Sequence, residues 1–157
     1  MKRTKNPAKE AEYRKRAADL VAQMTLHEKV SQMLSWAPAI ERLGIPAYNW
    51  WSEGIHGVGR AGTATVFPQA IGMAAAFDED MMEQVGNAIG VEARGKYNMC
   101  RAHGDRDIFK GLTVWAPNIN IFRDPRWGRG HETYGEDPFL TSRLGVRFVE
   151  GMQGNDP

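Results

Sequence analysis

The stretch GLTVWAPNINIFRDPRWGRGHETYGEDPFLTSRLGVRFVEGMQG, residues 111–154, contains an apolar segment, a charged loop and a helical pattern in that order. Residues 111–122 are mostly apolar and predict a buried strand, which the chain leaves at Pro117. Asp137 is suited to cap a helix that begins at Pro138. Apolar residues recur every four positions and predict the buried face of this helix: Leu140, Leu144, Phe148 and Met152. The stretch therefore predicts a strand, a loop and a helix.

A second unit of the same kind precedes this one. Residues 42–51 form a short apolar segment that predicts a strand. Residues 52–72 contain five glycines and no period, and they predict a long loop. Asp78 is suited to cap a helix that continues to about Asn98. Its expected apolar face consists of Met81, Met82, Val85, Ala88 and Ile89.

Two helices are expected before these units. Residues 8–22 are rich in Ala, Glu, Lys and Arg and predict a helix. Thr25 and Glu28 have the spacing of a capping box, which predicts a second helix that continues through Leu34. The helical lead-in 8–34 and the βα units at about 42–154 together predict an α/β fold with parallel strands. Both long loops follow strand ends, where parallel α/β folds place their functional sites.

Composition excludes several classes of protein. The chain has 157 residues, enough for one domain with a core, and its net charge is +1. This charge gives no basis for binding to nucleic acid or to a membrane surface. The single Cys100 has no partner for a disulfide or a metal cluster. The charged N-terminus lacks the apolar region of a signal peptide, and a cytoplasmic protein is expected.

The motif GVGRAG (57–62) has the GxGxxG spacing of a dinucleotide site. Such a site needs a helix after the third glycine, whereas β-branched residues and Pro68 follow here. We therefore expect loop glycines and no cofactor. The histidines lack the spacing of metal ligands, and no metal site is expected.

The segment NWWSEGIHG (49–57) places Glu53 after two tryptophans, just past the expected strand end. Aromatic rings stack on the apolar face of a sugar, and a carboxylate accepts hydrogen bonds from its hydroxyls. A tryptophan pair in the core beside a salt-bridged Glu53 is an equally good interpretation. The residues alone leave both open.

The loop FRDPRWGRGHETYGEDP (122–138) interleaves three arginines with four acidic residues. Arginine pairs carboxylates through two parallel hydrogen bonds, so most of these charges are expected to hold the loop together. One or two residues next to the strand end are expected to face a cleft instead.

The segments NWWSEGIHGV, ATVFPQAIGMAAAFD and VWAPNINIFRDPRWGRGHETYGEDP, in this order and spacing, resemble the N-terminal domain of glycoside hydrolase family 3. This family contains β-glucosidases and β-xylosidases, and the WWSE variant looks most like the β-xylosidase/α-arabinofuranosidase branch. The resemblance covers essentially the whole chain. It implies the N-terminal portion of a (β/α)8 TIM-like barrel, incomplete on its own, because a barrel takes roughly 200 residues or more.

The resemblance also implies roles for individual residues. Glu53 and Arg123 would hydrogen-bond the sugar in the first subsite, and Trp51 would line the pocket. The residues expected to support the pocket are Trp50, His56, Arg126, Trp127, Arg129, Glu132 and Glu136.

The resemblance places the catalytic groups of the family outside these residues. The nucleophile is an aspartate of a later motif, and the acid/base lies later still, so no catalytic residue is assigned here. We therefore expect a chain that positions a β-linked glycoside substrate and is inactive alone. Its expected partners are a C-terminal remainder or a second copy at the open barrel edges. The alternative is a non-catalytic sugar-binding or interaction module on the same fold.

Overall fold

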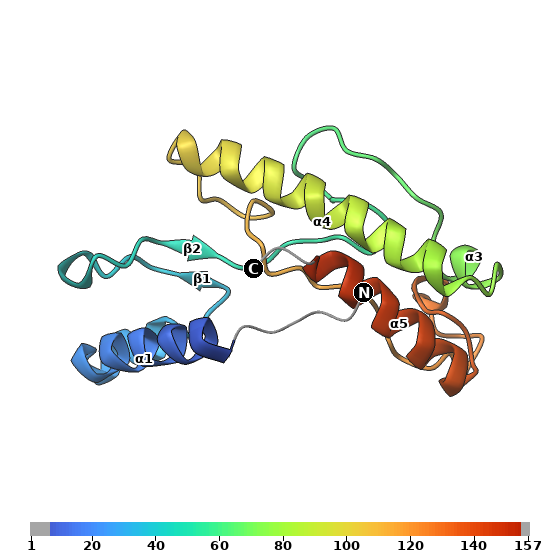
Figure 1. The fold of residues 1–157 in the computed structure, drawn as a ribbon, viewed down its shortest axis with the longest axis horizontal. Helices are drawn as coiled ribbons and strands as arrows, with labels where there is room; N and C mark the ends of the chain where they lie inside the picture. Colours follow the sequence, from blue (N-terminus) through green and yellow to red (C-terminus); the bar gives the residue numbers. More distant parts are fainter. Residues whose placement is uncertain (1–6, 155–157) are drawn as a thin grey trace. The chain divides into compact units, whose positions relative to one another are not determined.

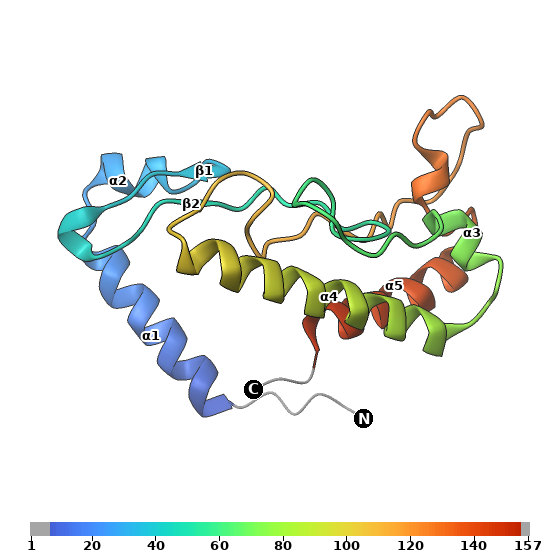
Figure 2. The ribbon, with the colours of Figure 1, turned by 90° about the horizontal axis from the view of Figure 1, so that it is seen from above.

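The computed structural model describes residues 7–154. They divide into two compact units, one that ends at Asn49 and one that spans Trp50–Gly154. Figures 1 and 2 show the elements of each unit. Within residues 7–154, no helix combines the length and the apolar character needed to cross a membrane.

The first unit contains two helices and a two-stranded antiparallel sheet. Its elements are α1 (Pro7–Gln23), α2 (Leu26–Ser31), β1 (Trp36–Ala37), a 3₁₀ turn (Glu41–Leu43) and β2 (Tyr48–Asn49). Trp36 pairs with Asn49, and Ala37 pairs with Tyr48. The helix predicted over 8–22 is confirmed, although none of the residues of α1 is buried. The strand predicted over 42–51 is confirmed at Tyr48–Asn49 alone.

The predicted capping box of α2 is present. The Thr25 hydroxyl accepts from the Glu28 amide at 3.3 Å, and the Glu28 carboxylate accepts from the Thr25 amide at 2.8 Å. Arg42 donates to the same carboxylate at 2.9 Å from Nε. The helix ends at Ser31 rather than at Leu34, so the predicted end is three residues too late.

The Glu28 carboxylate makes the stability of this unit depend on pH. The hydrogen bonds from Arg42 and from the Thr25 backbone lower the pKa of Glu28 from 4.5 to about 2. Because the folded pKa is depressed, its stabilising contribution is present above pH 4.5 and is lost as pH falls towards about 2. We expect Glu28→Gln to show less acid destabilisation than the unsubstituted chain over this interval in circular-dichroism titrations. Equal acid sensitivity of the two chains would contradict the expected role of this carboxylate.

The second unit is built on a pair of long helices. Its elements are α3 (Ala70–Ala74), α4 (Glu79–Ala102), a 3₁₀ turn (Gly130–Glu132) and α5 (Pro138–Gln153). Asp78 caps α4 by accepting from Met81 N at 2.9 Å, and Asp137 caps α5 by accepting from Leu140 N at 2.7 Å. Both caps were predicted. Helix α4 runs four residues past the predicted Asn98, and α3 was not predicted.

Helices α4 and α5 lie side by side in both views (Figures 1 and 2). The core between and around them contains Met82, Val85, Ile89, Leu144 and Phe148 together with residues of α3. The backbones approach closely at glycines: a Cβ atom at Gly86 would lie 2.4 Å from the carbonyl oxygen of Phe148.

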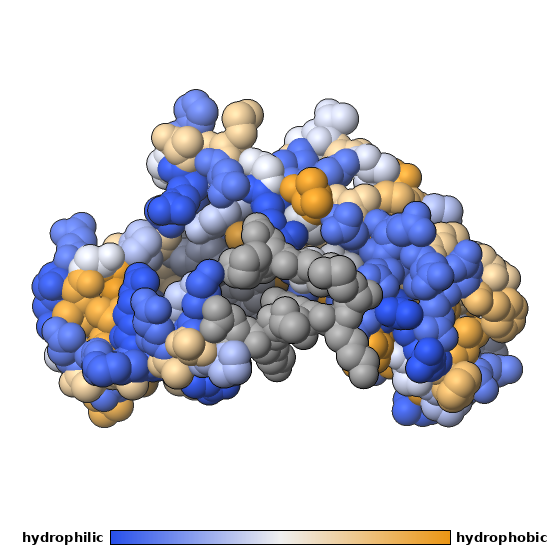
Figure 3. Space-filling view, viewed as in Figure 1, coloured by the Kyte–Doolittle hydropathy of each residue, from blue (hydrophilic) through white to orange (hydrophobic). Residues whose placement is uncertain are grey.

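An ion-pair network joins the exposed sides of the two helices. Arg143 donates to both oxygens of Glu79 at 2.8 Å. Arg147 donates to Glu83 at 3.0 Å and to Glu150 at 3.3 Å. Figure 3 shows hydrophilic atoms gathered over α4 and α5, where these side chains meet. Exposed ion pairs of this kind each contribute little to the free energy of unfolding. Their main effect is to make this surface polar.

The buried strand predicted over 111–122 is wrong for the described residues. Parallel pairing there is confined to a bridge between Ser52 and Val114, with Trp115 N donating to Ser52 O at 2.9 Å. Trp115 and Ile119 are exposed. A strand needs a partner along its length, and the described segments 50–53 and 111–116 meet only briefly.

Candidate functional site

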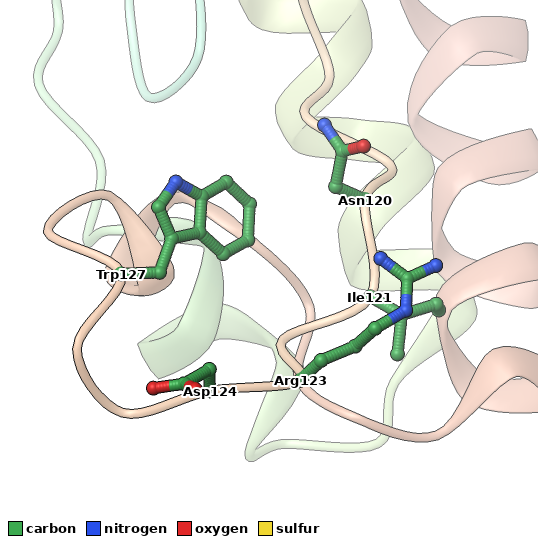
Figure 4. Close-up of a pocket in the computed structure, with 5 residues that line it drawn as sticks. All are labelled: Asn120, Ile121, Arg123, Asp124 and Trp127. Atoms are coloured by element: carbon green, nitrogen blue, oxygen red, sulfur yellow. The ribbon is translucent and has the colours of Figure 1, made fainter.

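The loop between the 111–122 segment and α5 borders an open cavity of about 270 Å³. The lining residues are Asn120, Ile121, Arg123, Asp124 and Trp127 (Figure 4). Figure 4 shows the guanidinium of Arg123 beside Ile121 and on the same side as Asn120, whereas the carboxylate of Asp124 points the opposite way. The indole of Trp127 extends toward the 120–123 segment. The cavity therefore combines a cation, an amide and an aromatic ring.

Arg123 differs from the other arginines of this loop. Arg126 donates to Asp124 at 2.9 Å from Nε and 2.6 Å from Nη2, and this hydrogen bonding lowers the pKa of Asp124. Arg129 donates to Glu132 at 2.6 Å from Nη2. Among the residues that the structure describes, Arg123 has no hydrogen-bond or ion-pair partner. Its five N–H donors are available to a ligand.

The Arg129–Glu132 pair lies next to the end of the 111–118 segment. Hydrogen bonds, first from Arg129 and also from Asn118, lower the pKa of Glu132. The pKa of Arg129 is raised mainly by its hydrogen bond to Glu132, with a smaller contribution from the charge of Glu53. The charge of Glu53 therefore acts on Arg129 across the space between the two predicted segments.

Glu53 has its own cation. Arg60 Nε lies 3.6 Å from Glu53 Oε2, and the guanidinium of Arg60 lies 5.2 Å from the ring centroid of Phe109. The side chains of this pair are exposed by 69% for Arg60 and 44% for Glu53, so its electrostatic contribution is screened by water. The Glu53 carboxylate keeps an accessible face for hydroxyl donors.

Three tryptophans form a stack beside Glu53. The ring centroids of Trp51 and Trp115 are 4.7 Å apart, and those of Trp50 and Trp115 are 5.8 Å apart with nearly parallel planes. Trp51 is 40% exposed and Trp115 is 51% exposed. The interpretation of a tryptophan pair buried in the core is therefore wrong for Trp51, which presents a ring face to solvent.

The remaining predicted residues are His56, Trp127 and Glu136. His56 Nδ1 lies 2.9 Å from Phe67 O, so this histidine holds the loop that follows Glu53. Trp127 packs against Phe122 with ring centroids 6.3 Å apart. Glu136 is exposed beside the cap of α5. The sugar-binding roles of these residues, and those of Glu53, Arg123 and Trp51, stay predictions.

Within residues 7–154, no three His, Cys, Asp or Glu side chains gather closely enough to hold a metal ion. Gly62 does not open a helix, because the next helix along the chain, α3, begins eight residues later at Ala70. Residues near the site that sequence reasoning missed are Arg60, Phe109, Trp115 and Asn118. Of these, Trp115 and Asn118 had a signal, because they lie at the expected strand end.

The chain matches the family model described as the glycosyl hydrolase family 3 N terminal domain over residues 16–156. It is 52% identical over 151 residues to probable beta-D-xylosidase 7 of Arabidopsis thaliana, which covers 90% of this chain and 19% of the relative. It is 50% identical over 143 residues to xylan 1,4-beta-xylosidase of Xylanibacter ruminicola, which covers 90% of this chain and 17% of the relative. The chain thus spans about a fifth of these relatives.

Solved structures give the same result. A family 3 exo-beta-xylosidase in complex with a xylobiose aziridine activity-based probe superposes with a TM-score of 0.76 and 38% identity, over 91% of this chain and 19% of that one. The beta-glucosidase DesR from Streptomyces venezuelae, in complex with D-glucose, has a TM-score of 0.64 and 34% identity, over 89% and 18% of the two chains. The fold is that of part of a (β/α)8 barrel domain. On these grounds the chain belongs to the N-terminal domain family of the family 3 glycoside hydrolases.

Proposed function

We propose that this chain is the sugar-positioning part of a retaining, exo-acting β-glycosidase that hydrolyses terminal β-linked xylosides or glucosides. The observation that carries the proposal is the guanidinium of Arg123, which has no partner among the described residues and lines a cavity together with Trp127. A cavity lined by both an arginine fork and an aromatic ring suits a sugar, whose hydroxyls accept hydrogen bonds and whose C–H face stacks. The activities that the relatives are named for, β-xylosidase above all, support the same reaction class.

Each residue of the site has a distinct role in this proposal. Arg123 donates to ring hydroxyls, Glu53 accepts from them, and the exposed face of Trp51 packs against the sugar. The Arg129–Glu132 pair supports the wall of the site. The relatives found with a xylobiose probe and with D-glucose support a pocket for one terminal sugar.

The proposal assigns no catalytic step to these residues. Retaining glycosidases need a carboxylate nucleophile and a second carboxyl group that acts as acid and then as base. Asp124 and Glu132 are held as anions by their arginine partners, which disfavours proton donation by either. We assign both catalytic carboxyl groups to polypeptide other than these 157 residues.

The purified chain is therefore expected to bind methyl β-D-xyloside or methyl β-D-glucoside without hydrolysing an aryl glycoside. Binding is followed by tryptophan fluorescence, because Trp51 and Trp115 lie beside the proposed site. Hydrolysis is followed by release of 4-nitrophenol from its β-xyloside and β-glucoside. Release above the uncatalysed rate would contradict the assignment of the catalytic groups, and absence of binding would contradict the proposed sugar site.

A further inference from the structure

The loop from Glu53 to Phe67, called here the 53–67 loop, is closed at its neck by backbone hydrogen bonds. Gly59 N donates to Glu53 O at 3.0 Å, and Phe67 N donates to His56 O at 2.8 Å. Its Gly59 lies against the side chain of Glu53: a Cβ atom there would lie 3.2 Å from Glu53 Oε2. The position of Gly59 and of the next residue, Arg60, therefore determines where the Glu53 carboxylate sits.

Helix α4 holds the next part of this loop through two charged side chains. Lys96 Nζ donates to Ala61 O at 2.8 Å and to Thr63 O at 2.6 Å. The Glu92 carboxylate accepts from Thr65 N at 3.0 Å and from Thr65 Oγ1 at 2.5 Å. Glu92 and Lys96 are four residues apart and therefore lie on the same face of α4. These hydrogen bonds are charge-assisted, which makes them stronger than neutral ones.

Glu92 and Lys96 are the side chains that hold residues 61–65 of the loop. Within residues 7–154, every hydrogen bond from 61–65 to another segment goes to Glu92 or Lys96. None of residues 60–66 is buried. A segment with few apolar contacts opens locally without unfolding the core. Loss of these bonds should therefore displace the loop more than it destabilises the protein.

We propose that Lys96 and Glu92 are positioning residues for the sugar site, which act by holding Gly59 and Arg60 against the Glu53 carboxylate. The inference rests on the proposed function, because it takes Glu53 as the acceptor for sugar hydroxyls. Neither residue touches the sugar. Lys96 has the greater effect, because its acceptor Ala61 directly follows Arg60.

The test compares Lys96→Met with Arg94→Met in the same chain. Arg94 also lies on α4 and also donates to two backbone carbonyls, those of Met152 at 3.0 Å and Gln153 at 2.7 Å, at the end of α5. Both substitutions remove a cation and two such bonds, but only Lys96 contacts the loop. We expect about a tenfold weaker affinity for methyl β-D-xyloside in Lys96→Met, measured by tryptophan fluorescence. Arg94→Met should bind as the unsubstituted chain does, with a similar change in melting temperature.

Lys96→Arg keeps the charge and the donors and should restore most of the affinity. Equal affinities of Lys96→Met and Arg94→Met would overturn the positioning role and leave the proposed sugar site in place. Absence of binding by the unsubstituted chain would overturn both. Amide hydrogen exchange measures the opening of the loop in the absence of sugar. The amides of Gly59 and Phe67 should lose protection against exchange in Lys96→Met and keep it in Arg94→Met. Unchanged protection in both variants would overturn the anchoring itself.

Discussion

Arg123→Ala is expected to weaken the binding of methyl β-D-xyloside by about ten- to a hundredfold. A hydrogen bond from a charged donor contributes about 1.5–3 kcal/mol, and each 1.4 kcal/mol corresponds to a tenfold change in affinity. Arg123 has no hydrogen-bond or ion-pair partner among the described residues, so its removal breaks no polar interaction of those residues. The loss should therefore appear in the dissociation constant and leave the melting temperature nearly unchanged.

Two further variants make this result specific. Arg101, in the last turn of α4, is also exposed, and within residues 7–154 its side chain has no hydrogen-bond or ion-pair partner either. Arg101→Ala therefore removes the same charge away from the cavity. It should bind the sugar with unchanged affinity. Arg123→Lys keeps the charge but not the planar fork, and an intermediate affinity is expected. If Arg123→Ala binds as tightly as Arg101→Ala, the guanidinium does not contact the sugar.

Gly86→Ala is expected to lower the free energy of unfolding by about 2–3 kcal/mol and the melting temperature by about 10 °C. The new methyl group would lie 2.4 Å from Phe148 O, which belongs to the backbone of α5 and has no freedom to rotate away. The helices would have to separate, and separation would loosen the packing of Met82, Ile89 and Leu144 between them.

Gly95→Ala is the matched control on the same helix. A Cβ atom there meets no atom within 4 Å, so the substitution adds helix propensity without a clash. It should raise stability by about 0.5–1 kcal/mol. Thermal unfolding followed by circular dichroism measures both variants. A melting temperature of Gly86→Ala at or above that of Gly95→Ala would show that the helices are not in such close contact.

The helices were predictable because their signals are local. Asp78, Asp137 and the Thr25–Glu28 pair each act within four residues of themselves, and all three cap as the sequence indicates. The strands were not predictable to the same extent, since a strand depends on a partner distant in sequence. Residues 111–122 have a strand composition, yet their pairing with the 50–53 segment is limited to the Ser52–Val114 bridge.

The candidate site also combines local contacts, which the sequence predicts, with long-range contacts, which it does not. The pairing of arginines with nearby acids in the 122–138 loop follows from their spacing, and Arg126 and Arg129 do pair with Asp124 and Glu132. The contacts of Lys96 with Ala61 and Thr63 span more than thirty residues and leave no periodic signal. Long-range contacts of polar side chains to loop backbone are therefore the part that sequence reasoning missed.

The glycines at the crossing of α4 and α5 also bear on how related sequences are compared. A Cβ atom at Gly90 would lie 2.6 Å from Met152 O, and one at Gly151 would lie 2.1 Å from Glu83 O. A side chain at either position would therefore clash with the backbone of the facing helix. Invariance at these columns of an alignment would therefore record the approach of two backbones, and a search for functional residues by conservation should discount them.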